Sequence, residues 1–531
     1  MPERVRNEDG VASAISSRQT MPSALPDRAL GGLALALIAA ACLLASLPVW
    51  RSDALTLDEH ASYWIAAEEN PGTLLQRSLE YSATPPLSFA LQRAALDLLG
   101  KHAWALRLPS LLALWAAPLF VFLAARSTFG WRAAMLAPLL MAWHPDLWEP
   151  GRLARTYGVT VGLSSAVLYA TARWMQAPTS WRWLLVWTGF QAALLWNHYV
   201  NVAFVAAVSG LLAVRWFSKS APPLVRGRLL LAGLLLLVFG APLIPAFVRV
   251  WELRPFLEFI RTSIPIERQI GAFALCLALP AILCGSVFRS RKPAVVPSLE
   301  PAAMPGWMGL LLVVGPGLQL LFVALSFLLS PTLGHPRYAL AGAPATVLVV
   351  AALLARAANG IAVPLAAAGV VAGWVFVGQP IWVSPVIDSA EAADWKVVGE
   401  VVQAEGVEGE TIFVYGGLVE AGLIPTFGHD LLFEEYIASR VGRFFVTTPH
   451  PRYGLPLLWT QLEHCRPIYD AVIDDAGERG KSIWIACATD IDLGRDAGEA
   501  MRVLLQRQGW KVTLSRDLST ARVQRLSPPE Q

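Results

Sequence analysis

The sequence predicts a polytopic α-helical membrane domain followed by a C-terminal soluble α/β domain. Of its 531 residues, 55% are hydrophobic and only 15% are charged, a composition typical of an integral membrane protein. Uncharged runs long enough to cross the ~30 Å hydrocarbon layer recur between residue 29 and about residue 384. From residue 385 onward such runs stop and charged residues return, which marks the soluble part.

The first uncharged run, 29–50, follows a polar tail of residues 1–28 and has no small-residue cleavage site. It is therefore expected to be a membrane anchor and not a removable signal peptide. The run 183–214 is divided by the polar hairpin 197–201 and is counted as two spans, which brings the total to about eleven. The remaining predicted spans are 108–125, 133–145, 156–172, 229–248, 269–288, one within 301–336, 338–355 and one within 357–387.

Residues 85–100 have apolar side chains at helical spacing, with Gln92, Arg93 and Asp97 on the other face, which predicts a helix lying in the membrane interface. Keeping this helix outside the membrane gives a first outer loop of 51–103. The segments then assigned to the cytoplasmic side carry sixteen basic residues against five acidic ones, as the positive-inside rule requires. This arrangement places the N-terminal tail in the cytoplasm and the C-terminal domain in the periplasm or outside the cell, with the spans in the inner (plasma) membrane.

The segment 385–531 is expected to be the extracytoplasmic α/β domain. From residue 388 onward it holds 14 basic and 22 acidic residues, and it alternates apolar strands with amphipathic helices. The predicted helices are 388–406 and 494–509, and the predicted strands are 411–415, 443–448 and 482–488.

Charge and cysteine content exclude two function classes. The net charge is only +3, so a basic surface for nucleic acid is not expected. The five cysteines have no paired spacing of the kind that a zinc or iron–sulfur site needs.

Polar residues gather at the outer ends of the predicted spans. Placing polar groups near the membrane costs free energy, so such residues often have a function. The first outer loop carries the adjacent carboxylates Asp58 and Glu59. Three further outer segments carry Arg152, Arg155 and Tyr157, then His198 in the hairpin, then Arg337 and Tyr338. A guanidinium is suited to hold a phosphate, and a carboxylate can take a proton from an attacking hydroxyl or amine. Together they predict group transfer from a phosphate-bearing lipid.

An ordered series of short motifs strengthens this prediction. It consists of Asp58-Glu59, Thr84-Pro85-Pro86-Leu87, Gly100 with 106–110, 126–130, Arg155 with Tyr157, Asn197-His198-Tyr199 and Arg337-Tyr338. In this order, over residues 30–380, the chain resembles the polytopic glycosyltransferases of the C superfamily, near the protein O-mannosyltransferases and the lipid A aminoarabinose transferase.

The resemblance implies inverting transfer of a sugar from a polyprenyl phosphate donor, in the outer leaflet, to an unidentified acceptor. It implies that Asp58 is the catalytic base, with Glu59 beside it. The donor and its phosphate would then be bound by Arg155, Arg337, Tyr338, Arg152, Tyr157 and His198. Thr84 replaces the usual histidine of the family and Ser88 its usual aromatic residue, so the resemblance does not imply which sugar is carried.

Each of these residues also has a structural interpretation. Adjacent carboxylates are common on outer loops, arginines at span ends often snorkel to the interface, and a histidine in an apolar hairpin is more often structural than catalytic. Arg152 and Arg155 nevertheless oppose the positive-inside trend, which favours binding. Asp58 and Glu59 could also bind a divalent metal, but the sequence offers no further ligands, so no metal ligand is assigned.

Two alternatives from other classes stay open. A transporter or flippase could bind the same lipid phosphate without chemistry, and an inactive receptor or assembly protein could work through its C-terminal domain. Transporters usually place charge near the membrane midplane and often carry repeated halves. Here the charges lie at one rim and no repeat is evident, which favours the transferase.

Overall fold

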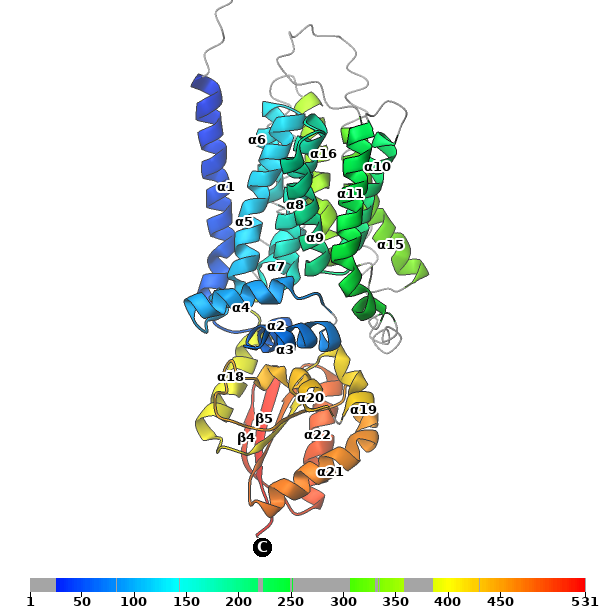
Figure 1. Cartoon of the computed structure of the whole chain (residues 1–531). Helices are drawn as coiled ribbons and strands as arrows, with labels where there is room; N and C mark the ends of the chain where they lie inside the picture. Colours follow the sequence, from blue (N-terminus) through cyan, green and yellow to red (C-terminus); the bar gives the residue numbers. More distant parts are fainter. Residues whose placement is uncertain are drawn as a thin grey trace, which may run out of the picture.

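The computed structural model describes residues 25–530 with gaps at 83, 143, 218–222, 249–250, 252–305, 330–332, 334, 358–384 and 429. The predicted span 269–288 and most of the predicted span 357–387 lie outside these residues. The described chain forms a helical bundle, a layer of short helices across one end of it, and a sheet-containing domain beyond that layer (Figure 1).

The bundle is built from the long apolar segments of the sequence, and its helices run side by side (Figure 1). Its members are α1 (Leu25–Arg51), α5 (Ala103–Thr128), α6 (Trp131–Ala142), α8 (Thr156–Gln176), α9 (Trp181–Asn197), α10 (Asn201–Trp216), α11 (Pro223–Gly240), η2 (Ala241–Leu243), α14 (Trp307–Leu312), η3 (Val313–Gly317), α15 (Leu318–Leu328), η5 (Pro336–Gly342) and α16 (Ala343–Ala357). The division of 183–214 into two helices is confirmed, because α9 and α10 meet at the predicted hairpin.

Four stretches of the described residues are long and apolar enough to cross a membrane: Ala103–Thr128, Pro223–Val248, Trp307–Leu328 and Arg337–Ala355. The chain is thus a multi-pass membrane protein by length and composition. The predicted total of about eleven spans stays a prediction.

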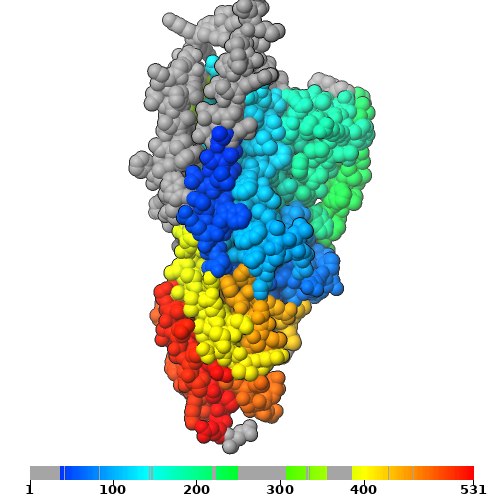
Figure 2. Space-filling view, turned by 90° about the vertical axis from the view of Figure 1, so that its left-hand side faces the viewer, coloured from blue at the N-terminus to red at the C-terminus, as the bar shows by residue number. Residues whose placement is uncertain are grey.

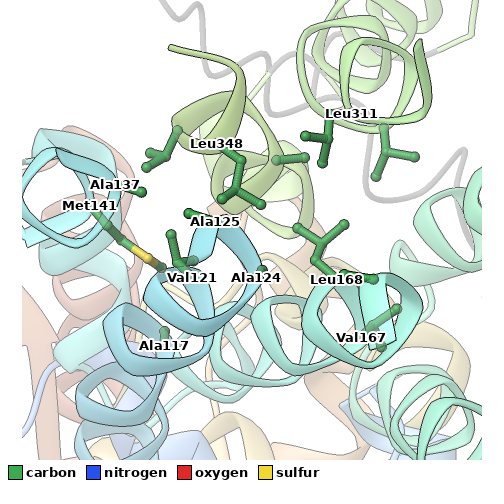
Figure 3. Packing of buried hydrophobic residues seen from close by; sticks show 14 of the residues in the cluster. Ala117, Val121, Ala124, Ala125, Ala137, Met141, Val167, Leu168, Leu311 and Leu348 are labelled. Atoms are coloured by element: carbon green, nitrogen blue, oxygen red, sulfur yellow. The ribbon is translucent and has the colours of Figure 1, made fainter. Parts of the chain in front are cut away.

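Small residues allow the helices of the bundle to approach closely. A Cβ atom added at Gly162 of α8 would lie 2.8 Å from the backbone oxygen of Ala113 in α5. In the same buried cluster, Ala124 of α5 lies toward Leu168 of α8, and Val121 of α5 lies beside Met141 of α6 (Figure 3). Packing through small side chains is the usual way for membrane helices to associate, since lipid gives them no hydrophobic reason to do so.

Five short helices form what we call the juxtamembrane layer: α2 (Leu57–Ala66), α3 (Pro71–Gln76), η1 (Arg77–Tyr81), α4 (Leu87–Leu99) and α7 (Pro145–Arg152). The predicted helix at 85–100 is confirmed as α4, which lies across the end of the bundle (Figure 1). Its polar face differs from the prediction, because Gln92 is buried in the protein while Leu98 is exposed.

The C-terminal domain is an α/β domain with a five-stranded sheet in the order β2-β1-β3-β5-β4. Strands β2, β1 and β3 are parallel, and β4 and β5 form an antiparallel hairpin at one edge. Its elements are α18 (Ala390–Glu405), β1 (Thr411–Tyr415), η6 (Val419–Leu423), α19 (Ile424–Phe427), α20 (Leu431–Ile437), η7 (Ser439–Val441), β2 (Arg452–Gly454), η8 (Trp459–Gln461), α21 (Leu462–Glu478), β3 (Ile483–Ala488), α22 (Asp492–Arg507), β4 (Lys511–Asp517) and β5 (Ala521–Ser527).

The predicted strand 443–448 is wrong, because these residues are irregular and the strand of this region is β2. The aromatic residues of 443–448 lie at the interface with the juxtamembrane layer: the ring of Phe444 lies 4.9 Å from that of Tyr63 on α2. The β4–β5 hairpin was not expected, since its first strand is largely exposed and carries few apolar residues.

The C-terminal domain and the juxtamembrane layer share one hydrophobic core. Ala61, Trp64 and Ile65 of α2 belong to the same buried cluster as strands β1 and β3. Figure 2 shows the domain, coloured yellow to red, packed directly against the blue N-terminal helices on this face. The domain is therefore fixed against α2, the helix that carries the predicted catalytic carboxylates.

Candidate active site

Asp58 lies in the first turn of α2, where the sequence Thr56-Leu57-Asp58-Glu59 begins the helix. The Glu59 carboxylate accepts a hydrogen bond from the Thr56 backbone N–H at 3.0 Å, which is one half of a capping box. Because Glu59 turns back to the helix start, Asp58 on the adjacent position is left to face outward. The Asp58 side chain keeps 35% of its surface exposed.

Glu59 is held in a fully buried ion pair. Arg107 of α5 approaches both of its oxygens at 2.7 Å, and the Ala154 N–H donates to one of them at 2.9 Å. Arg107 also donates to the backbone oxygens of Ser52 and Ala54 at 2.9 and 2.6 Å. Both oxygens of Glu59 are thus engaged, so the structure offers no support for the direct catalytic role predicted for this residue; it ties α2 to α5 and to the chain before α8.

Arg155 forms an ion pair with Asp58, with 3.5 Å between Nε and Oδ2. Arg155 is the residue that precedes α8, and Ser110 of α5 donates to its backbone oxygen at 2.9 Å. Burial, the largest single effect, works against the positive charge, but Asp58 together with Tyr157 and Tyr436 outweighs it, so the pKa of Arg155 is raised. The guanidinium is therefore permanently cationic beside a carboxylate.

Arg337 joins the same cluster from the start of η5. Its guanidinium carbon lies 5.3 Å from the ring centre of Tyr338 and 5.9 Å from that of Tyr157 on α8. The ring of His198, in the hairpin between α9 and α10, lies 6.0 Å from Tyr157 and 6.1 Å from Tyr338. Asp58 also interacts electrostatically with Arg337. The start of α2, the start of α8, the α9–α10 hairpin and η5 therefore meet around Asp58.

A buried network of hydrogen bonds holds Asn197, the last residue of α9 before the α9–α10 hairpin. The Asn197 side chain donates to the Thr156 backbone oxygen and to Thr160 Oγ1, both at 2.8 Å. Its Oδ1 atom accepts a hydrogen bond from the Ser88 hydroxyl of α4. This network links α4, α8 and α9 next to His198.

Arg152 does not belong to the cluster. It is buried at the end of α7, where it donates to the backbone oxygens of Ala45 and Trp148 at 3.0 and 3.1 Å and pairs with Glu149 at 2.9 Å. These contacts connect α7 to α1, which is a structural position. The structure thus brings Arg155 to Asp58 and separates Arg152 from it.

Two side chains of the C-terminal domain reach the cluster without having been predicted. The Tyr436 hydroxyl donates to Glu420 Oε1 at 3.2 Å, and the charge of Arg155 acts on both residues. The one local signal in the sequence was Gly416-Gly417, a turn directly after β1. Its link to the membrane domain lies in tertiary contacts that the sequence pattern does not contain.

The cluster offers the partly exposed carboxylate of Asp58, the guanidinium groups of Arg155 and Arg337, and the rings of Tyr157, Tyr338 and His198. Among the described residues, no group of three or more His, Cys, Asp or Glu side chains is placed to hold a metal ion. Such a set of groups can bind a phosphate and accept a proton beside it.

Comparisons with known proteins concern the family and the fold of the chain. Residues 83–244 match the family model described as Dolichyl-phosphate-mannose-protein mannosyltransferase. The sequence matches none of the curated proteins with which it was compared.

Among solved structures, the fold is similar to that of ArnT from Cupriavidus metallidurans bound to undecaprenyl phosphate. This likeness has a TM-score of 0.58 at 13% identity and covers 93% of this chain and 98% of ArnT. AglB, an oligosaccharyltransferase from Archaeoglobus fulgidus solved with an inhibitory peptide and a dolichol-phosphate, gives a TM-score of 0.43 at 13% identity, over 85% of this chain and 69% of AglB. The chain therefore shares the fold of ArnT, and its residues 83–244 match the family model described as Dolichyl-phosphate-mannose-protein mannosyltransferase.

Proposed function

We propose that this protein is an inverting glycosyltransferase that moves a sugar from a polyprenyl phosphate donor to an acceptor on the outer face of the membrane. The observation that carries the proposal is the ion pair between Asp58 and Arg155, with Arg337 beside it. Fixed cations that meet the charge developing on a leaving phosphate, next to a base, are the groups that such a transfer needs.

In the proposed reaction the donor phosphate binds Arg155 and Arg337, while Tyr157, Tyr338 and His198 line its site. The phosphate takes the Arg155 guanidinium from Asp58, which frees the carboxylate. Asp58 then removes the proton of the acceptor hydroxyl or amine as the acceptor lone pair attacks the anomeric carbon. The bond from that carbon to the phosphate oxygen breaks, its electron pair stays on the lipid phosphate, and a single displacement inverts the configuration.

The proposed topology follows the charge distribution. Residues 1–28 would lie in the cytoplasm, residues 29–384 would form the membrane domain, and residues 385–531 would lie outside the inner (plasma) membrane. The basic loops of the sequence support this orientation, because positive segments are retained on the cytoplasmic side.

The test is release of polyprenyl phosphate from a panel of polyprenyl phosphate sugars by the purified protein. Asp58→Asn should lower the release by about 10²-fold or more while the protein still folds and binds the donor. Asp53→Asn is the matched control, since Asp53 lies in the same loop but pairs with Lys396 at 2.7 Å. Unchanged release by Asp58→Asn would reject Asp58 as the base.

A transporter or flippase would give a different result. Vesicles containing the protein would then move a lipid-linked sugar between leaflets, and no polyprenyl phosphate would be released with any donor. Release by the wild-type protein, lost in Asp58→Asn and kept in Asp53→Asn, favours the transferase.

A further inference from the structure

The turn Gly416-Gly417 places Glu420 on the face of the C-terminal domain that contacts the membrane domain. Strand β1 ends at Tyr415, and Gly417 has φ +79°, a conformation that other residues rarely adopt. A Cβ atom at Gly416 would lie 2.8 Å from the Ile437 backbone oxygen. The glycine pair thus allows the chain to turn sharply into η6, which carries Glu420.

Glu420 lies beyond the carboxyl end of β1, where open sheets with parallel strands usually bind ligands. The neighbouring strand β3 is parallel to β1 and ends at the same edge of the sheet. Asp490, which follows β3, and Asp58 of α2 both interact electrostatically with Arg440. The carboxyl edge of the parallel strands therefore faces the end of the helical bundle.

Tyr436 links Glu420 to the helix that carries Asp58. Its ring packs 5.4 Å from Trp64 of α2, and its hydroxyl donates to Glu420. Tyr436 is buried, whereas Glu420 is half-buried, so the carboxyl has surface left for a ligand. A carboxyl group has about four lone-pair positions, and the Tyr436 hydroxyl occupies one of them.

The charges of the active-site cluster act on this pair directly. Asp58 and Arg155 both influence Glu420, and both influence Tyr436. Burial, reinforced by the Asp58 carboxylate, raises the pKa of Glu420. A carboxyl group accepts hydrogen bonds when ionised and can also donate one when protonated, which suits a sugar hydroxyl.

We propose that Glu420 and Tyr436 bind hydroxyl groups of the sugar carried by the donor, so that the C-terminal domain determines which sugar is transferred. This inference rests on the proposed function. The sugar is covalently joined to the phosphate that Arg155 and Arg337 would hold, so its ring must lie within one ring length of them. Glu420 and Tyr436 belong to the C-terminal domain and are close enough to the cluster for the charges of Asp58 and Arg155 to act on them.

A site built to hydrogen-bond a hydroxyl discriminates strongly against a sugar that lacks it or presents it in another configuration. Removing one such partner should therefore change the ratio of kcat/KM between sugars more than it changes the overall rate. We expect Glu420→Gln and Tyr436→Phe to alter the ratio between the best and the next donor by about 10-fold or more.

The experiment measures kcat/KM for undecaprenyl phosphate carrying mannose, glucose, galactose or arabinose, by release of undecaprenyl phosphate. Glu435→Gln is the matched control, because Glu435 is the neighbour of Tyr436 and accepts instead from Trp64 Nε1 at 3.4 Å. The control should keep the wild-type order of donors, and the two test variants should change it.

Two results would overturn the inference. One is an equal fall for all four donors in Glu420→Gln and Tyr436→Phe, which would indicate a structural role. The other is an unchanged donor ratio with a raised KM for the acceptor, which would place the pair at the acceptor. Absence of release from any donor by the wild-type protein would instead reject the proposed function itself.

Discussion

Asp58 and Glu59 are neighbours in sequence, but the fold gives them opposite surroundings. Glu59 is fully buried against Arg107, whereas Asp58 keeps about a third of its side chain exposed beside Arg155. The difference follows from the helix start, since the side chain at the third position turns back to the capping residue. One carboxylate therefore organises the loop, and the other is available to a substrate.

The buried pair leads to a stability prediction. Arg107→Ala leaves the Glu59 charge without its partner in the interior, which should cost about 3–5 kcal/mol of unfolding free energy. The melting temperature of the purified protein should fall, and release of polyprenyl phosphate should fall with it because the chain before α2 loses its contacts to Arg107.

The control is Arg466→Ala, which removes a surface pair with Glu463 at 3.4 Å. An exposed pair of this kind contributes less than about 1 kcal/mol. Equal melting temperatures for the two variants would show that the buried pair does not hold this part of the fold.

Glu434 gives a pH prediction within the C-terminal domain. Its carboxyl is buried, accepts from the Gly454 N–H at 2.6 Å, and has one oxygen without a partner. Burial raises its pKa from the ordinary 4.5 to about 8. The folded protein therefore keeps a proton that the unfolded chain releases, and stability is lost as pH rises from about 4.5 to about 8.

Glu434→Gln should remove this loss, because the amide stays neutral and keeps an oxygen for Gly454. Across this interval the unfolding free energy of the wild type should fall relative to that of the variant by at most ~1.4 kcal/mol per pH unit. The melting temperature of the wild type should fall relative to that of the variant in the same direction. Parallel melting curves at every pH would contradict the assignment of a proton to Glu434.

At the scale of elements, the approach of α5 and α8 sets the position of Arg155. A Cβ atom at Gly158 of α8 would lie 2.5 Å from the Gly151 backbone oxygen and 2.7 Å from that of Ser110. Ser110 in turn holds the Arg155 backbone. Any side chain at position 158 must therefore push α8 away from α5 at the point where Arg155 emerges.

Gly158→Ala should cost about 1–3 kcal/mol of stability through overpacking and should lower polyprenyl phosphate release. Gly189→Ala is the control, since a Cβ atom there meets nothing within 4 Å. In that open helical position the alanine should stabilise the protein by up to ~1 kcal/mol. The melting temperatures of the two variants should thus move in opposite directions, and movement in the same direction would contradict this account.

Helices of the membrane domain could be predicted from sequence because long uncharged runs have few other solutions. Helices α9 and α10 were found for this reason, whereas α4 was found from its apolar residues at helical spacing. The segment 443–448 was not, because its apolar residues contact α2 and not a neighbouring strand. A pattern of alternating side chains does not say which surface they are buried against.

The active-site cluster could be predicted in part at the scale of the whole molecule. Asp58, Arg155 and Arg337 stand out because charges at the outer ends of spans are costly, and the structure brings them together. Glu420 and Tyr436 could not be found, since they come from a separate domain whose docking on α2 depends on tertiary packing. Arg152 also lies at a predicted span end, but it contacts Ala45, Trp148 and Glu149, so position at a span end does not by itself predict membership of the cluster.

The orientation of the whole molecule in the membrane is the last prediction. The basic loops favour a cytoplasmic N-terminus, and the cluster at the opposite end of the bundle then lies with the C-terminal domain outside. Alkaline phosphatase is active only after export, so its fusion after residue 530 should be active and its fusion after Phe217, before α11, should be inactive. The reverse pattern would put Asp58 on the cytoplasmic side, where the proposed donor in the outer leaflet could not reach it.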